Sequence, residues 1–253
     1  MSVLHGHEDK LEAFRKLIEC DRLGHAYLFY GSPEIGKYHF ARLLAFALEF
    51  GSFNIKNDVL IDSMFVEPDE KGTIGIEAVR GVRYFLSQKP LRSSRRLVVI
   101  NDAKTLTREA QSAMLKIVEE PGEASTIIFV AEEPRTLFAP LRSRLRKVYF
   151  RSFCKDELKA ILIEHYNVPA EGASALAEKS FGRLGRALKL RKKIKIAKDN
   201  LESEISEKAA ELYFKGVKEN IERLKWLVSR EAALKRFNLN TNLQRKALEY
   251  KLR

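Results

Sequence analysis

The chain has 253 residues, of which 45% are hydrophobic and 32% charged, which is the composition of a globular protein with one or two domains and a sizeable core. A formal net charge of +12 favours an anionic partner, most simply nucleic acid. The two cysteines, Cys20 and Cys154, are too few for a disulfide scaffold or a cysteine zinc site. Without an apolar stretch of signal-peptide or membrane-span length, we expect a cytoplasmic protein that makes no membrane contact.

The first fifty residues predict a helix, a strand and a second helix. Apolar residues at helical spacing indicate a helix over 9–20, with Asp9 as its N-cap. The apolar run "AYLFY" at 26–30 is typical of a buried strand, and a glycine-rich turn then leads into a helix over about 37–50. A strand, a glycine turn and a helix in this order form the context in which backbone N–H groups can face a bound phosphate.

The turn itself, "GSPEIGKY", nearly matches the phosphate-binding pattern G-x-x-x-x-G-K-[ST]. Gly31, Gly36 and Lys37 are in register, but Tyr38 stands where a Ser or Thr hydroxyl would hold the Mg²⁺ of a nucleotide. We therefore interpret the turn as a descendant of a phosphate loop. The alternative is a tight strand-to-helix turn with a solvated lysine.

Strands and helices continue to alternate up to residue 150. This alternation predicts an α/β fold, a parallel sheet covered by helices on both faces. The helix at 107–121 should begin with Thr107 as its N-cap and end at Pro121. The expected strands lie at 59–68, 95–102, 126–134 and 147–150, and the expected helices at 75–90 and 107–121.

From Lys155 onwards the pattern predicts helices only. The stretch 183–198 holds eight Arg or Lys residues and no acid. A run of this kind is usually a solvated helix face, and the alternative is a surface for nucleic acid or another acidic partner.

Four segments together resemble the bacterial DNA polymerase III clamp-loader AAA+ family, in the family's order and over roughly residues 5–190. They are "LGHAYLFYGSPEIGK", "VEPDEKGTIGIEAVRGVRYFLSQKP", "LVVINDAKTLTREAQSAMLKIVEEPGEASTIIFVAEEP" and "LFAPLRSRLRKVYF". The likeness is strongest to delta prime subunits. It implies an AAA+ P-loop-type α/β domain at 1–152, a small helical lid at 153–195 and a short, collar-like C-terminal helical region at 196–253.

The resemblance also implies that catalysis is shared between neighbouring subunits. In this family an arginine of one subunit contacts the nucleotide held by the next, and the matching segment is "RSR". It places Arg144 as that arginine finger, with Ser143 before it, and Leu145 replaces the family's usual cysteine as a packing change. The alternative is an ordinary exposed arginine before a strand.

The residues that would hold this chain's own nucleotide depart from the family pattern in three places. Besides Tyr38, the second nucleotide motif ends Asn101-Asp102 where Asp-Glu is expected, and the polar sensor position falls on Ala131. The resemblance therefore implies ATP binding that is weak or absent through Gly31, Gly36 and Lys37, and it does not decide whether Mg²⁺ is held. Arg186 matches the lid arginine that contacts nucleotide, the alternative being a salt bridge.

Many members of this family carry a four-cysteine zinc module after the helix that follows the phosphate loop. Here "EFGSFNIKNDVL" stands in that place without a cysteine, so we expect no zinc. The implied role is an ATPase-deficient subunit in a hetero-oligomer with gamma/tau and delta subunits. It would serve the sliding clamp indirectly and act on primer-template DNA. Two alternatives stay open: an active gamma/tau-like motor, and a non-catalytic AAA+ adaptor that binds nucleic acid through 183–198.

Overall fold

A computed structural model describes residues 5–55, 58–199, 201–214, 216–236, 246–248, 250 and 251. Its chain divides into two compact units, Met1–Ala187 and Leu188–Arg253. No helix within the described ranges is both long and apolar enough to cross a bilayer. The expected domain boundaries at 152/153 and 195/196 stay predictions.

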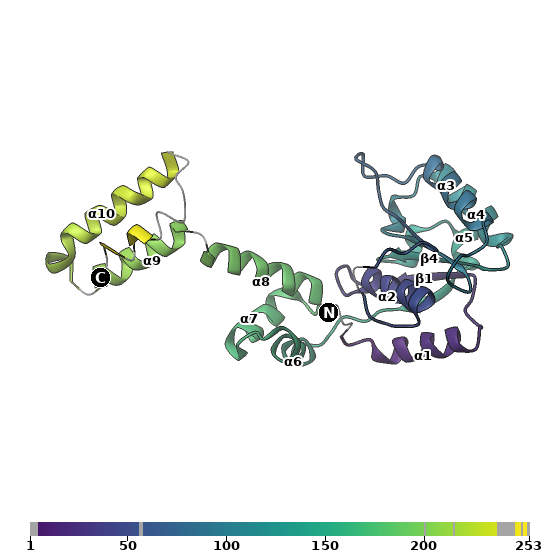
Figure 1. The fold of residues 1–253 in the computed structure, drawn as a ribbon, viewed down its shortest axis with the longest axis horizontal. Helices are drawn as coiled ribbons and strands as arrows, with labels where there is room; N and C mark the ends of the chain where they lie inside the picture. The colour runs from purple at the N-terminus through teal and green to yellow at the C-terminus, as the bar shows by residue number, and fades with distance from the viewer. Residues whose placement is uncertain are drawn as a thin grey trace. The chain divides into compact units, whose positions relative to one another are not determined.

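The first unit is built on a five-stranded, wholly parallel sheet in the order β2-β3-β4-β1-β5, of which Figure 1 labels the adjacent strands β4 and β1. The strands are β1 (Ala26–Tyr30), β2 (Ser63–Val66), β3 (Arg96–Ile100), β4 (Ser125–Ala131) and β5 (Arg146–Tyr149). The helices are α1 (Glu8–Glu19), α2 (Lys37–Phe50), α3 (Ile76–Ser87), α4 (Arg108–Glu119), α5 (Ala139–Ser143), α6 (Lys155–Tyr166), α7 (Ala170–Ser180) and α8 (Leu184–Asp199). The predicted parallel α/β architecture is confirmed.

Helices cover both faces of the sheet because the central strands are apolar on both sides. Side chains alternate along each strand, so Leu28 of β1 joins one core cluster while Phe29 joins the other. The first cluster contains residues of α3 and α4, such as Val82 and Met114, and the second contains residues of α1 and α2, such as Phe40. Figure 1 shows α3 and α4 on the side of the sheet opposite α1 and α2.

Two expected helix caps have different outcomes. Thr107 is the N-cap of α4, and its hydroxyl accepts a hydrogen bond from the Ala110 N–H. The prediction of Asp9 as the cap of α1 is wrong, because the helix already begins at Glu8 with His7 as N-cap. The Glu8 carboxylate instead accepts the N–H of Gly6, just before the helix.

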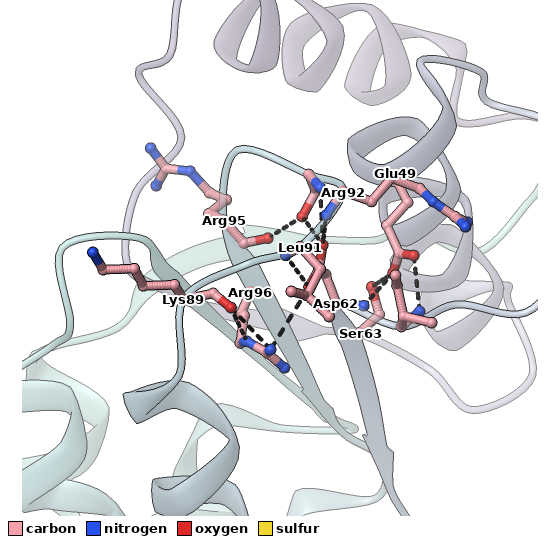
Figure 2. Close-up of polar contacts among 10 residues, drawn as sticks. Glu49, Asp62, Ser63, Lys89, Leu91, Arg92, Arg95 and Arg96 are labelled. Atoms are coloured by element: carbon pink, nitrogen blue, oxygen red, sulfur yellow. Dashed lines mark hydrogen bonds and ion pairs between the residues drawn. The ribbon is translucent and has the colours of Figure 1, made fainter.

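The amino-terminal ends of β2 and β3 are joined by a buried carboxylate (Figure 2). Asp62 is fully buried, and it accepts hydrogen bonds from the backbone N–H groups of Leu91, Arg92 and Ser93 at 2.6–3.0 Å. Burial alone would favour the neutral acid, but these hydrogen bonds outweigh it and lower the pKa of Asp62. The 91–93 turn is therefore fixed to the end of the sheet.

A second buried carboxylate supports the first. Glu49, near the end of α2, accepts the N–H groups of Ile61 and Asp62 and the hydroxyl of Ser63. Its contacts hold the chain as it enters β2, as Figure 2 shows.

The second unit consists of helices in the part that is described. The carboxyl-terminal residues of α8 lead to α9 (Leu201–Phe214) and α10 (Val217–Arg236). Buried Ile205, Leu227 and Leu248 form a small core of their own.

Candidate nucleotide and subunit-interface site

The predicted phosphate loop lies in the crevice between the carboxyl ends of β1 and β4. The chain after β1 enters α2, which packs on one face, and the chain after β4 enters α5, whose Leu141 belongs to the core of the other face. Adjacent strands whose connections leave to opposite faces create the crevice in which open α/β sheets bind ligands. The Gly31 N–H joins the ends of the two strands by donating to the Glu132 carbonyl at 3.0 Å.

Two glycines give the loop its shape. Gly31 has φ +139°, and a Cβ there would lie 2.1 Å from the Phe150 carbonyl oxygen, so no other residue fits. Gly36 has φ 104° and is the N-cap of α2. The loop thus has the left-handed turn and close backbone approach that a phosphate loop requires.

Lys37 is buried and already bound to the loop. Its ammonium group donates to the carbonyls of Gly31 and Ser32 at 2.7 and 2.6 Å, which leaves one of three N–H donors for another acceptor. Burial lowers the pKa of Lys37 to about 8, against the opposing effect of the Glu132 and Asp102 carboxylates. The loop can therefore offer a phosphate a single lysine donor in a partly acidic surrounding.

Two distant segments brace the outside of the loop. The Gly185 N–H, at the start of α8, donates to the Glu34 carbonyl at 2.8 Å, and the His7 ring contacts the Ile35 carbonyl at 3.2 Å. A Cβ at Gly185 would lie 2.9 Å from the same Glu34 oxygen, so the approach of α8 is close. The loop conformation is thus coupled to the segment that the sequence predicts as the lid.

The metal side of the site is filled by a different arrangement. The ring of Tyr38 packs edge-on against Phe65. Burial raises the pKa of Tyr38 to about 12, and the neighbouring Glu67 carboxylate adds to the effect. The Asn101 amide also reaches Glu67, at 3.5 Å. Tyr38 and Asn101, the two departures from the motif, therefore converge on a carboxylate that sequence reasoning missed.

The remaining acids of the crevice are held by a lysine. Lys104 pairs with Glu132 at 3.0 Å and with Asp102 at 3.6 Å. Ala131, the sensor position, is buried in the core and brings no polar group to the crevice. Glu132 follows it directly, and no sequence motif predicts that its carboxylate lies near Lys37.

The side chains at the metal half differ from those that usually hold the Mg²⁺ of a nucleotide, because Tyr38 and Asn101 stand in place of a short hydroxyl and a carboxylate. Mg²⁺ needs closely placed oxygen ligands at about 2.0–2.1 Å. Within the described ranges, no three His, Cys, Asp or Glu side chains gather as a metal site. The phosphate half keeps Gly36 at the start of α2 and the one remaining donor of Lys37.

Arg144, the predicted finger, lies at the end of α5. Its guanidinium pairs with Glu119 of α4 at 2.6 Å and donates to the Pro140 carbonyl at 2.9 Å, with its side chain 42% exposed. Ser143 is also exposed, and its hydroxyl donates to Pro140. Leu145 is buried in the core, as a packing role requires. The structure thus presents Arg144 at the surface on a short, hydrogen-bonded helix end.

Arg186, the predicted lid arginine, stacks over the ring of Phe181 with 5.3 Å between the guanidinium carbon and the ring centroid. It lies one residue after Gly185, which contacts the loop. The Phe181 stack was not foreseen from the sequence.

The parallel sheet, the glycine loop at its crevice and the helices that follow define a AAA+ α/β protein. The chain belongs to the family described as DNA polymerase III, delta subunit, whose sequence pattern matches residues 6–153. This places it among the clamp-loader AAA+ proteins, as the resemblance implied.

Individual relatives agree with this placement. Over 58% of the chain it is 31% identical to the DNA polymerase III subunit delta' of Bacillus subtilis, covering 48% of that protein. Over 57% it is 30% identical to the gamma/tau subunit of Mycobacterium bovis, covering 27%. The chain therefore spans between a quarter and a half of the length of these relatives. A gamma subunit-related protein of Thermotoga maritima shares the fold, with a TM-score of 0.52 at 22% identity over 88% of this chain and 77% of that one.

Proposed function

We propose that this chain is a delta prime-like clamp-loader subunit that does not hydrolyse ATP and lends Arg144 to the nucleotide of a neighbouring motor subunit. The observation that carries the proposal is a contrast within one domain. Arg144 is exposed and held by a surface carboxylate, whereas the chain's own metal side is filled by Tyr38, Glu67 and Asn101.

The physical reason for such a division is electrostatic. Negative charge develops on the transferred phosphoryl group in the transition state, and a fixed guanidinium from a second subunit stabilises it. In known systems an arginine finger is worth about 10³–10⁵ in rate. Only the neighbour needs a complete metal site for this reaction, so the loss of metal ligands here leaves Arg144 useful.

The proposed partners follow from the same role. The chain would assemble in a cytoplasmic hetero-oligomer with gamma/tau-type and delta subunits, which opens the sliding clamp and places it on primer-template DNA. The helices of residues 196–253 would serve as a short collar in that assembly. A gamma/tau-like motor is less well supported, because its hydrolysis requires the metal ligands that Tyr38 and Asn101 replace.

Reconstitution with gamma/tau and delta subunits tests the proposal. Arg144→Ala should leave the isolated chain folded, lower the DNA- and clamp-stimulated ATPase at the one interface it completes, and lower clamp loading further. Arg142→Ala is the matched control, since Arg142 lies two residues earlier on the same short helix, α5. Full activity with Arg144→Ala, or equal loss with both variants, would reject Arg144 as the finger.

A further inference from the structure

A hollow with an excess of positive charge lies at the amino-terminal ends of the strands, whereas the glycine loop lies at their carboxyl-terminal ends. Its volume is about 700 Å³, and its lining comes from α1, from the segments that precede β1, β3 and β4, and from the first residues of β4 and β5. Because all five strands are parallel, their amino-terminal ends all lie on this side of the sheet. The hollow is therefore about one strand's length away from the crevice that holds Lys37. The hollow is therefore a separate site from the one described above.

Three arginines and one glutamate supply the formal charges of the lining. Arg22, Arg95 and Arg146 face a cavity that also includes Glu123. Arg95 is engaged, because its guanidinium donates to the Leu23 carbonyl at 2.9 Å and pairs with Asp21. No hydrogen bond or ion pair engages the guanidinium groups of Arg22 and Arg146 within the part of the chain that the structure describes.

The position of Arg95 is fixed by the buried Asp62 network. Asp62 accepts a hydrogen bond from the N–H of Ser93, and the Ser93 hydroxyl donates to the Arg95 carbonyl at 2.7 Å. The Arg95 side chain is only 12% exposed. One wall of the hollow is thus rigid before any ligand arrives, which reduces the entropy cost of binding.

The Arg146 side chain lies directly against Gly24. Arg146 is the first residue of β5, and a Cβ on Gly24 would lie 3.0 Å from its Nε atom. The absence of a side chain at Gly24 lets the Arg146 side chain lie against the backbone before β1. A methyl group there would push the guanidinium away without removing its charge.

We propose that this hollow binds a phosphate monoester, carried either by a free nucleotide or by the end of a nucleic-acid strand. Guanidinium groups present planar pairs of N–H donors that match phosphate oxygens, and Arg22 and Arg146 offer such donors at the hollow, where Glu123 is the one carboxylate of the lining. The cavity is larger than one phosphate group needs, which leaves room for the attached nucleoside.

Binding assays on the 253-residue chain test this inference with two probes. The first is a short single-stranded DNA with either a 5′-phosphate or a 5′-hydroxyl, followed by fluorescence anisotropy. The second is adenosine 5′-monophosphate against adenosine, followed by calorimetry. We expect the phosphorylated form of at least one probe to bind about tenfold or more tightly than its unphosphorylated control.

Three variants locate the binding. Arg22→Gln with Arg146→Gln should abolish the preference for phosphate, and Gly24→Ala should weaken it several-fold while the net charge is unchanged. Arg83→Gln removes one positive charge, where the double variant removes two, from an exposed position on α3 outside the hollow, and should change the affinity by less than about twofold.

The two probes distinguish the two possible sources of the phosphate. Preference for the nucleotide alone identifies a free nucleotide as the ligand, and preference in the DNA probe identifies a strand end. No preference in either probe, a preference that survives the double arginine variant, or an equal loss with Arg83→Gln would overturn the proposal. Failure here would leave the Arg144 proposal untouched, because the latter is measured through the ATPase of a neighbouring subunit.

Discussion

The guanidinium of Arg144 and the carboxylate of Glu119 form an ion pair of 2.6 Å that ties the end of α5 to the end of α4. Both side chains are about 40% exposed (42% and 38%), so solvent screens the pair and its contribution to folding is small, about 0–1 kcal/mol. The pair instead determines whether the Arg144 side chain is free for another acceptor.

Glu119→Gln should therefore release Arg144 with little effect on stability. We expect the variant to bind a nucleotide-loaded motor subunit up to about fivefold more tightly, because the ion pair no longer has to be broken. Glu120→Gln, at the adjacent exposed position, is the control. Surface plasmon resonance measures the effect, and weaker binding by Glu119→Gln would mean that Glu119 orients Arg144 rather than competing for it.

Hydrolysis by the isolated chain should be negligible. Tyr38 and Asn101 both face Glu67 and give Mg²⁺ no hydroxyl or carboxylate of the usual kind, so turnover should stay well below about 1 s⁻¹, the low end of ordinary enzyme rates. A coupled ATPase assay checks this, with Lys37→Ala showing the same background. A rate near 1 s⁻¹ that depends on Lys37 would contradict the prediction.

Lys37 should titrate far from the other lysines. Its pKa of about 8 lies below the ordinary 10.5, so between these values the unfolded chain binds a proton that the folded chain has lost, and raising the pH stabilises the fold across this interval. NMR of ¹³C-labelled lysine, assigned with Lys37→Met, should show the transition. Lys104 is the internal contrast, since hydrogen bonding to Glu132 raises its pKa. A Lys37 signal that moves with the bulk near 10.5 would be incompatible with its burial.

Replacing Asp62 should be costly, because its carboxylate accepts three backbone N–H groups away from water. Asp62→Asn puts an amide donor against those donors, and we expect a loss of about 2–4 kcal/mol in the free energy of unfolding by urea at neutral pH. Asp69→Asn makes the same chemical change in an exposed turn and should have far less effect. Equal stability of the two variants would disprove the role given to Asp62.

The Asp62 carboxylate should also add a component to the free energy of unfolding that is lost in acid. The folded pKa of Asp62 is depressed, so its stabilising effect is complete above the unfolded value of about 3.9 and disappears as the pH falls through the lower folded value. Asp62→Asn should remove this component. Unfolding curves measured from neutral to acid pH for both proteins would show it as a difference that shrinks as the pH falls, and a constant difference would argue against it.

Much of the fold could be predicted because its signals are local. Apolar runs between turns located the strands, and the Gly31–Lys37 spacing located the loop. Contacts between distant residues could not be predicted in this way. Glu67 lies 34 positions before Asn101, and no pattern in either segment indicates that they meet. Asp62 was placed inside a strand over 59–68, whereas β2 begins at Ser63 and Asp62 instead receives the N–H groups of a turn 29–31 residues later.

The approach of Gly31 to the Phe150 carbonyl has a bearing on how proteins are classified from pattern matches. This glycine is demanded by the chain's own packing, and Gly36 by the left-handed entry into α2, whether or not a nucleotide is ever bound. The two glycines of the signature are thus required by the fold itself and are not specific to hydrolysis. A genome search that reads only the glycines and the lysine therefore reads residues that packing also demands, and the residue after the lysine, Tyr38 here, carries the information about the metal side.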